Sequence, residues 1–529
     1  MPPEVSSIFI VVSWSVRRGG PARTARGPRR PVHGTVAARA DTRADTRADT
    51  RGPGVPPTCK CGPMPAEPRT RTFDDGSDAV PDPVPGAVTR VVVVGAGIAG
   101  LACANALATA GTDVVLVEAR DGVGGRLRTV EVGGHTADLG GAWVHHPEEN
   151  LLTDWLALAG VDWVVDPTGT RFTGADLGEA RTLTPAELEG TGYAVLEPVA
   201  AHLRAALEAG EPDVSAAAAI DAYLADAHSP GPERDRLRQL MAAMVEQDGS
   251  GPLEAISARW ALTGGMLVGD VVDNVPVGGY RSVLAPLAAP LRQAGRLLLG
   301  RLVTHVRTTD EGVRVEGVTD DGEAWSETGS HVVVTVPLGV LKAGSITFDP
   351  PLPAARQAVV DRTGFGTMEK VFLSFEEPFW REKHTGLQHS VIYPADRDEP
   401  ATWTWDFGLS PTLMFLVASS AVERLQRDPR AFALEQLEAV YGGPLPAEPT
   451  DVVSTDWAHD ELARGAYGHV RPGQDDSDFD VLGEPVGRVC FAGESTDAER
   501  AGYADGAMAT GLREAKRLLG RASVELTAG

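Results

Sequence analysis

The stretch RVVVVGAGIAGLACANALATAGTDVVLVEARDGVGGRLRT, residues Arg90–Thr129, decides the fold of this 529-residue chain. Val91–Val94 are four β-branched residues in a row, which is typical of a strand buried on both faces. Gly95, Gly97 and Gly100 follow with the spacing G-x-G-x-x-G. In this pattern the first glycine permits a sharp turn, the second lets the backbone approach a pyrophosphate, and the third lets a helix pack on the strand. The stretch therefore predicts a dinucleotide-binding β-α-β unit.

The residues after this turn support the prediction. A helix is expected over residues 98–110, and its N-terminal N–H groups would face the phosphates. Val114–Val117 form the second strand, and Glu118 ends it 23 positions after Gly95, where a carboxylate can accept hydrogen bonds from ribose hydroxyls. Gly124-Gly125-Arg126 then offers a second glycine turn with a fixed positive fork. NAD-dependent dehydrogenases do not usually need such a second clamp.

The stretch GAGIAGL…VLVEARDGVGGRLRT resembles the flavin-containing amine oxidases, a family that includes monoamine oxidases, polyamine oxidases and flavin-type histone lysine demethylases. Three later segments are also similar to that family: DLGGAW at 138–143, VVVTVPLGVL at 332–341, and FAGEST at 491–496 followed by GYADGA at 502–507. The resemblance covers about residues 88–520 and implies FAD as the cofactor. It also implies an α/β fold: a Rossmann-like FAD-binding domain assembled from separated segments, and an α+β substrate domain with a mixed sheet.

The resemblance implies a set of cofactor contacts. Glu118 is expected at the adenosine ribose, Arg120 and Arg126 along the cofactor, and Val303 at the adenine through its backbone. Covalent relatives have a cysteine where this chain has Ala466, so we expect FAD to be bound non-covalently. The full set of expected cofactor-binding residues is Gly95, Gly97, Ala99, Gly100, Glu118, Arg120, Gly125, Arg126, Gly141, Ala142, Trp143, Val303, Trp457, Gly493, Glu494, Tyr503 and Ala504.

The same resemblance implies the residues of the reaction. Lys370 matches the family lysine that reaches flavin N5 through a water, and a buried lysine has a lowered pKa. Tyr467 and Tyr503 match the aromatic rings that flank a substrate amine, which suits electron-rich ring faces. His145 is expected to bind substrate, as is Glu246, which lies with Asp248 in a segment similar to polyamine oxidases. No metal is expected.

The domain boundaries follow from these segments. Residues 1–86 read as a disordered extension rich in arginine and proline, with ADTR repeated three times over residues 40–51. A strand is expected over residues 297–306 and a helix over residues 233–245. We assign residues 87–150, 272–345 and 484–522 to the FAD-binding domain, and residues 151–271 and 346–483 to the substrate-binding domain.

Charge and hydropathy indicate which partners and which cellular location to expect. Residues 1–71 hold 13 Lys and Arg against 5 Asp and Glu, whereas the remaining chain holds 35 against 68. Such an acidic body repels nucleic acid and attracts cationic small molecules. No apolar run approaches the ~20 residues that span a bilayer. The basic residues follow the first apolar run instead of preceding it, so we expect a cytoplasmic protein, with export as the minority alternative.

These observations lead to one functional hypothesis with alternatives. The chain is expected to oxidise a small, polyamine-like amine with O2, through hydride transfer from the α-carbon to flavin N5, giving an imine or aldehyde and H2O2. An L-amino-acid oxidase of the same fold is the first alternative, and a carotenoid- or porphyrin-type desaturase is the second. The particular amine and the oligomeric state are not readable from the sequence.

Overall fold

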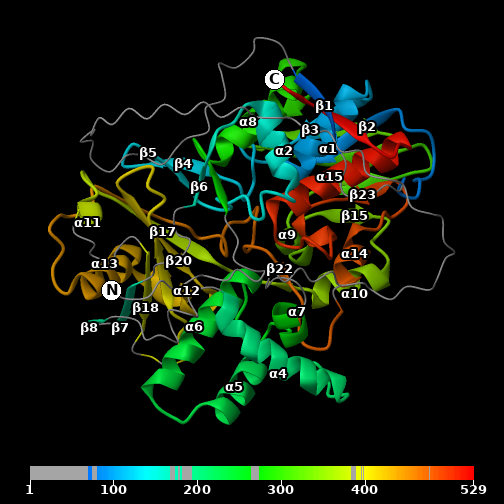
Figure 1. Cartoon of the computed structure of the whole chain (residues 1–529). Helices are drawn as coiled ribbons and strands as arrows, with labels where there is room; N and C mark the ends of the chain where they lie inside the picture. Colours follow the sequence, from blue (N-terminus) through cyan, green and yellow to red (C-terminus); the bar gives the residue numbers. More distant parts are fainter. Residues whose placement is uncertain are drawn as a thin grey trace, which may run out of the picture. The chain divides into compact units, whose positions relative to one another are not determined.

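The computed structural model describes residues 69–73, 80–166, 173–176, 179–181, 193–263, 273–382, 389–394, 396, 398–475 and 477–529. All of them lie in one compact unit, Val55–Gly529 (Figure 1). The predicted disordered extension lies mostly outside the described residues. Among the described helices, none combines the length and the apolar character needed to cross a bilayer.

A five-stranded parallel sheet forms the nucleotide-binding half, with strand order β10-β3-β2-β14-β23. Its strands come from three parts of the chain that are far apart in sequence, as expected. The central strands are almost wholly valine and leucine because helices or a second sheet cover both faces. The strands are β2 (Arg90–Val94), β3 (Asp113–Val117), β10 (Leu297–Leu298), β14 (His331–Val334) and β23 (Val489–Phe491).

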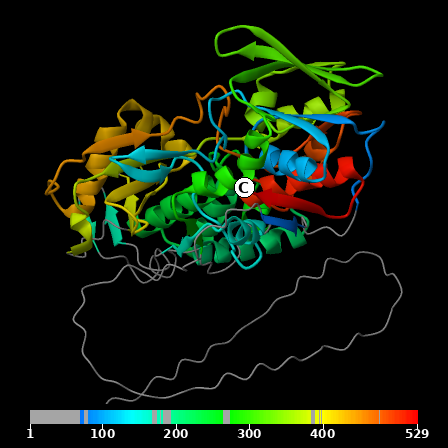
Figure 2. The same ribbon diagram turned by 90° about the horizontal axis from the view of Figure 1, so that it is seen from above.

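Three helices pack on one face of this sheet: α1 (Ile98–Thr109), α8 (Tyr280–Gln293) and α15 (Ala504–Leu519). Residues 98–107 of α1 are all buried. Helices α1 and α15 lie side by side, blue and red in Figures 1 and 2. Gly511 permits this close approach, since a Cβ atom there would lie 2.1 Å from the carbonyl oxygen of Ala99. Helices α1 and α15 therefore meet near the first glycine turn.

A four-stranded sheet covers the other face, in the order β13-β12-β11-β15. Figure 2 shows its hairpins beside the parallel sheet. The single strand expected over residues 297–306 is wrong, because the chain turns at Gly300, whose φ of 63° lies in the left-handed region. The strands of this sheet are β11 (Arg301–Thr308), β12 (Val313–Thr319), β13 (Ala324–Gly329) and β15 (Thr347–Asp349).

The disordered extension expected over residues 1–86 reaches too far towards the C-terminus, because a strand lies within that range. Residues Arg69–Phe73 form β1, which pairs antiparallel with the C-terminal strand β24 (Val524–Ala528). Alternating threonines favour the extended chain, and the buried ring of Phe73 lies 6.2 Å from that of Trp155. A partner more than 450 residues away supplies the hydrogen bonds, so no local pattern announces this strand.

The boundary at residue 151 also differs in the structure. Helix α2 (Leu151–Ala159) contacts α8 and α15, and Trp155 is fully buried in the same core as α1. Strand β6 (Trp163–Val165) then pairs with β9 (Asn274–Pro276). Residues 151–165 therefore pack with the nucleotide-binding half instead of opening the substrate domain.

A seven-stranded mixed sheet forms the second half, in the order β21-β17-β20-β19-β18-β7-β8. Only the β18–β7 pair is parallel. Alternate side chains face opposite cores: Phe415 packs towards α13, and Leu416 packs towards the helices around α6. The strands are β7 (Thr173–Asp176), β8 (Glu179–Arg181), β17 (Glu369–Ser374), β18 (His389–Tyr393), β19 (Thr402–Trp405), β20 (Thr412–Val417) and β21 (Asp451–Ser454).

Helices complete this half on both sides of the sheet (Figure 1). The expected helix over residues 233–245 is present and longer, because Pro232 starts it and Ser250 ends it in the left-handed conformation. The helices are α4 (Glu197–Glu208), α5 (Ala216–Ala227), α6 (Pro232–Gly249), α7 (Ala258–Thr263), α10 (Ala354–Arg362), α13 (Pro429–Tyr441) and α14 (Ser477–Gly483).

Candidate active site

The two glycine turns lie against each other. Gly97 and Gly124 form a parallel bridge, and the N–H of Gly124 donates to the carbonyl of Ala96 over 2.8 Å. Gly95 has a φ of 99°, and a Cβ atom at Gly100 would lie 1.9 Å from the Gly95 carbonyl oxygen. The geometry of the turn itself therefore requires glycine at these two positions. A Cβ atom at Gly97, in contrast, would meet nothing closer than 4.0 Å, so this position leaves a backbone face open.

Two helix N-termini are uncapped beside these turns. Helix α1 begins after Gly97 and α15 begins after Tyr503, and neither N-cap residue supplies a side-chain hydrogen bond. The first turns contain Ala99 and Ala504, whose small side chains leave the backbone accessible. Unpaired N–H groups and the helix dipole favour an anion at the end of α1. At α15 the dipole acts in the same way, and the Asp505 carboxylate, paired with Arg500, already lies in the first turn.

Glu118 closes the far end of this region. Its carboxylate accepts hydrogen bonds from the N–H of Ala96 (2.6 Å) and from the N–H of Arg120 (2.9 Å). Burial raises the pKa of Glu118, and the two backbone donors act against that rise. The Glu118 carbonyl accepts from the N–H of Arg301, where β11 begins. Val303 follows on β11, buried and next to a β-bulge. Val303 thus lies on the strand that begins beside Glu118.

The two predicted arginines have different partners. Arg126 donates to Glu494 Oε1 over 2.8 Å and to the carbonyl oxygen of Ala466, so it joins the second glycine turn to the C-terminal motif. Arg120 Nη2 donates to both carboxylate oxygens of Asp460, over 2.7 and 2.8 Å. The side chain of Arg120 therefore ties two chain segments together, and its direct contact with a cofactor is not supported by these bonds.

The DLGGAW segment approaches the second turn very closely. A Cβ atom at Gly140 would lie 1.7 Å from the carbonyl oxygen of Arg126, and one at Gly141 would lie 2.6 Å from Leu127 Cδ2. Ala142 is buried. Small residues are required here because two backbones touch, and this contact places Trp143 next to the turn.

Lys370 is buried on β17 with its amine against this segment. Its Nζ donates to the carbonyl oxygens of Asp138 (3.2 Å) and Gly140 (2.5 Å), and it lies 5.1 Å from the ring centre of Trp143. Burial lowers the pKa of Lys370 to about 8, and the Asp138 carboxylate acts in the opposite direction. The position gives a lysine that loses its proton at mildly alkaline pH.

A neighbouring carboxylate that the sequence analysis did not single out organises the loop after β21. Glu369 has no exposed surface and accepts hydrogen bonds from the N–H of Trp457 over 2.8 Å and from the hydroxyl of Thr455. Burial raises its pKa to about 7. Trp457 Nε1 in turn donates to the carbonyl of Leu139 over 3.3 Å. Adjacent residues on one strand thus serve two purposes, since Lys370 faces the site and Glu369 holds the loop.

A row of aromatic side chains continues from Trp143. The His145 ring lies 6.2 Å from that of Trp143 and 5.4 Å from that of Tyr503, to which it is nearly perpendicular. Tyr467 packs against Gly502, since a Cβ atom there would lie 3.5 Å from Tyr467 Cδ2. The Tyr467 hydroxyl donates to the carbonyl of Gln247 on α6. Four distant parts of the chain therefore meet in one row.

Charged side chains of both signs lie around this row, and Arg500 lies 5.1 Å from the ring centre of Tyr503. Asp273 Oδ2 lies 2.9 Å from His145 Nδ1. Burial, and after it the charge of Asp248, raises the pKa of both Tyr467 and Tyr503. Asp273 was missed from the sequence because acids are abundant and nothing local links residue 273 to residue 145.

Glu246 is not available to a substrate. It is 2% exposed, and its carboxylate accepts from the N–H and hydroxyl of Ser420 (2.9 and 2.8 Å) and from the N–H of Leu253 (3.2 Å). Burial raises its pKa despite these donors. The prediction that Glu246 pairs with a substrate ammonium is therefore not supported, and Asp248, one half-turn along α6, is the acid beside the tyrosines.

Comparison with known proteins agrees with this geometry. The model of the flavin containing amine oxidoreductase family matches residues 98–519. The chain belongs to this family. A pyridine nucleotide-disulphide oxidoreductase model also matches residues 56–137, which include the first glycine turn. The resemblance inferred from the motifs and the predicted α/β fold are confirmed.

Individual relatives of this family member include three kinds of protein. It is 30% identical to lysine-specific histone demethylase 1 homolog 2 of Arabidopsis thaliana over 83% of this chain and 59% of that protein. It is also 30% identical to polyamine oxidase 3 of Oryza sativa subsp. japonica, over 80% and 88%. A solved putrescine oxidase triple mutant superimposes with a TM-score of 0.65 at 25% identity, covering 82% of this chain and all of the other. The chain spans little more than half the length of the demethylase homologs it matches.

The cofactor of this family member is FAD, and the residues present fit it. Three glycines, two from the first segment and one from the last, leave their backbone faces free: the nearest atom to a Cβ would be 4.0 Å away at Gly97, 3.8 Å at Gly125 and 4.0 Å at Gly493. With the two uncapped helix ends, they can hold a diphosphate, and Glu118 is placed for the ribose. The predicted cofactor is confirmed, whereas each residue's individual contact stays a prediction.

Proposed function

We propose that the protein oxidises a small cationic amine at the carbon next to nitrogen, using FAD and O2. The amine loses a hydride and a proton and becomes an imine, O2 takes up the two electrons and two protons as H2O2, and water hydrolyses the imine to an aldehyde. The observation that supports this most directly is the row Lys370, Trp143, His145, Tyr503 and Tyr467, which begins at the second glycine turn.

The side chains of the row suit an amine. Tyr467 and Tyr503 offer ring faces that attract a cation or orient a nitrogen lone pair. Asp248 and Asp273 supply the negative field that concentrates cationic substrates at the site. Since Asp273 holds His145 Nδ1, Nε2 is the ring nitrogen that would meet the substrate nitrogen and accept its proton.

When bound, FAD supplies the hydride acceptor. Lys370 acts beside it as a positioned proton donor: an ammonium has three N–H groups, and two of them point to the carbonyls of Asp138 and Gly140. The third can hold a water near the reacting centre. Because its pKa is lowered to about 8, Lys370 can also release that proton at neutral to mildly alkaline pH.

Attachment of FAD is proposed to be non-covalent. The residue before Tyr467 is Ala466, which has no nucleophile to bond to the flavin. Acid precipitation of the purified protein should release all yellow colour into the supernatant. Flavin that stays with the precipitate would contradict this.

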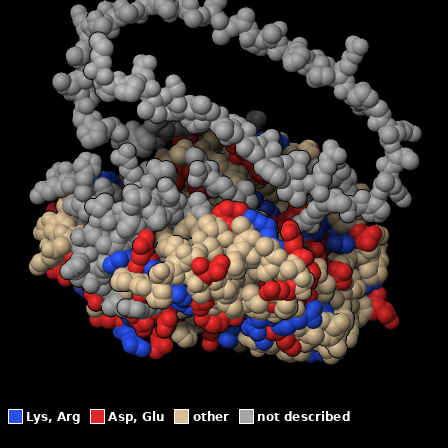
Figure 3. Space-filling model, turned by 60° about the horizontal axis from the view of Figure 1, so that its bottom comes forward, with Lys and Arg blue, Asp and Glu red and all other residues tan. Residues whose placement is uncertain are grey.

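The names of the relatives support an amine as the substrate and do not decide its size. Polyamine oxidase and putrescine oxidase are named for small amines, and the demethylase homologs for lysine of histones. On the face drawn in Figure 3, acidic and basic side chains are interspersed. With 68 Asp and Glu against 35 Lys and Arg after residue 71, the chain favours a free cationic amine over nucleic acid as its partner.

A peroxide assay on a panel of amines tests the proposal. The panel should hold putrescine, spermidine, spermine, tyramine, several L-amino acids and a dimethyl-lysine peptide, with Lys370→Met as the matched variant. We expect peroxide with at least one di- or polyamine, and a marked loss in the variant. Peroxide with L-amino acids alone would favour the amino-acid oxidase alternative, and no peroxide with any amine would refute the proposal.

A further inference from the structure

The turn that carries Glu494 is held from behind by α15. This turn, η3 (Glu494–Thr496), follows Gly493, whose φ is 137°. The N–H of Gly493 donates to Thr510 Oγ1 over 2.9 Å. Arg513 Nη1 donates to the carbonyl oxygen of Thr496 over 2.7 Å. Side chains of α15 therefore bind both ends of the turn.

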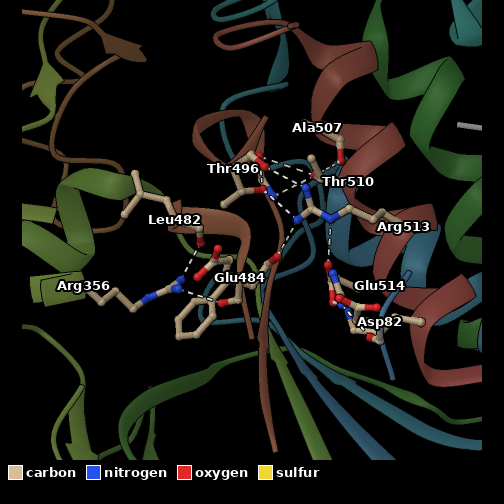
Figure 4. Close-up of polar contacts among 12 residues, drawn as sticks. Asp82, Arg356, Leu482, Glu484, Thr496, Ala507, Thr510, Arg513 and Glu514 are labelled. Atoms are coloured by element: carbon tan, nitrogen blue, oxygen red, sulfur yellow. Dashed lines mark hydrogen bonds and ion pairs between the residues drawn. The ribbon is translucent and has the colours of Figure 1, made fainter. Parts of the chain in front are cut away.

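The guanidinium of Arg513 spans the turn as a fork. Its Nη2 donates to the carbonyl oxygen of Phe491 over 2.9 Å, so the two nitrogens bond to the backbone on either side of Glu494 (Figure 4). Its Nε donates over 2.7 Å to Glu514, a carboxylate with no exposed surface. A Cβ atom at Gly483 would lie only 3.0 Å from Nη2. Packing and charge together fix the fork in one orientation.

Glu494 links the turn η3 to the second glycine turn. Its Oε1 accepts from Arg126 Nη1 over 2.8 Å, and its side chain is nearly buried. Helix α15 also presents its uncapped N-terminus to the same region. The helix that holds the turn is thus also the helix that begins directly after Tyr503, so the turn and this helix end are fixed relative to each other.

We propose that Arg513 and Thr510 are positioning residues for the cofactor. They touch no cofactor atom themselves, and they set the place of Gly493 and Glu494 against the N-terminus of α15. The inference rests on the FAD site of the proposed function and not on which amine is oxidised. It predicts that loss of the fork weakens FAD binding more than it weakens the fold.

Arg356 supplies a matched control in the same neighbourhood. It is 4% exposed and stacks on the Phe491 ring at 3.7 Å, so it touches the same strand end as Arg513. Its hydrogen bonds, however, go to the carbonyls of Val481, Leu482 and Glu484, and not to the turn (Figure 4). Burial lowers the pKa of Arg356 to about 10.

The test titrates FAD into the deflavinated full-length protein and its variants Arg513→Met, Arg513→Lys, Thr510→Val and Arg356→Met. Hydrogen bonds from a charged donor are stronger than those between neutral groups, so their loss should let the turn leave its place. We therefore expect the FAD dissociation constant to rise roughly ten- to a hundredfold in Arg513→Met. Arg513→Lys should recover part of the loss, and Thr510→Val should lose up to about tenfold.

Two further readouts separate positioning from plain destabilisation. The visible absorbance bands of bound flavin should shift in Arg513→Met and stay unchanged in Arg356→Met, although both lower the melting temperature. Wild-type FAD affinity in Arg513→Lys and Thr510→Val would overturn the inference, as would an equal loss of affinity in Arg356→Met. Because FAD titration needs no amine, failure of the proposed amine oxidation would leave this result readable.

Discussion

Lys370 should cost the protein stability while it serves the reaction. Its amine is buried and makes hydrogen bonds to two backbone carbonyls, with no carboxylate in direct contact. Holding a proton there is unfavourable, which is why its pKa falls from 10.5 to about 8. The Lys370→Met variant removes the proton and keeps a side chain of similar length.

The size of the effect follows from proton linkage. Each pH unit between the folded and unfolded pKa corresponds to about 1.4 kcal/mol, so a fall of this size corresponds to roughly 3 kcal/mol. The sign is set by the unfolded chain, which binds the proton more tightly. The penalty is therefore fully present below pH 8, and the folded state gains stability as pH rises from about 8 to 10.5.

Urea unfolding, followed by tryptophan fluorescence from pH 7 to pH 10.5, measures this. The free energy of unfolding of the wild type minus that of Lys370→Met should rise by about 3 kcal/mol across the range, because other titrating groups are common to both proteins. A difference that stays constant with pH would refute the reasoning. Flavin reduction or reoxidation should slow in the variant at every pH, and unchanged rates of both would remove Lys370 from the mechanism.

A second, half-buried lysine gives the control. Lys342 donates to the carbonyls of Val360, Asp361 and Thr363, and burial lowers its pKa as well. It lies outside the row of site residues. Lys342→Met should destabilise the fold, since three carbonyls lose their donor, and should leave amine oxidation unchanged.

Three more variants probe the glycine turn and the acid beside His145. Gly97→Ala should leave the melting temperature within a few degrees and weaken FAD binding by at least about tenfold, since its methyl group enters open space where a diphosphate would approach; unchanged FAD affinity would contradict the turn's role. Gly100→Ala should destabilise the fold by several kcal/mol, roughly, because its Cβ would lie 1.9 Å from the Gly95 carbonyl, and a stable variant in thermal unfolding would contradict this. Asp273→Asn should raise the KM for diamines about tenfold with little change in FAD affinity, and an unchanged KM would show that this acid does not act on substrate.

The sequence predicted what local chemistry decides. The valine run, the three glycines and the acid at the end of the second strand each have one physical purpose at a fixed spacing, so β2, α1 and β3 appear where expected. Lys370 was placed on a buried strand because apolar residues surround it, and β17 is buried throughout.

The parts that were missed depend on partners far away in sequence. Strand β1 exists because β24 pairs with it, and Asp273 matters because the fold brings it to His145. Glu246 and Asp248 are two residues apart on one helix, and their opposite roles follow from which neighbour each one meets. Charge and spacing alone do not distinguish such residues, since many acids along the chain have the same local pattern.

The three-part assembly of the parallel sheet has a consequence for synthesis of the protein. Strands β2 and β3 can pair early, but β14 pairs with β2 across about 240 residues, and β23 joins only after residue 489 has been made. Pairing across such distances is slow and leaves strand edges exposed. The cofactor site is therefore complete only after β23 has been made, and a nascent chain stopped before β23 should retain no flavin however long it is given to fold.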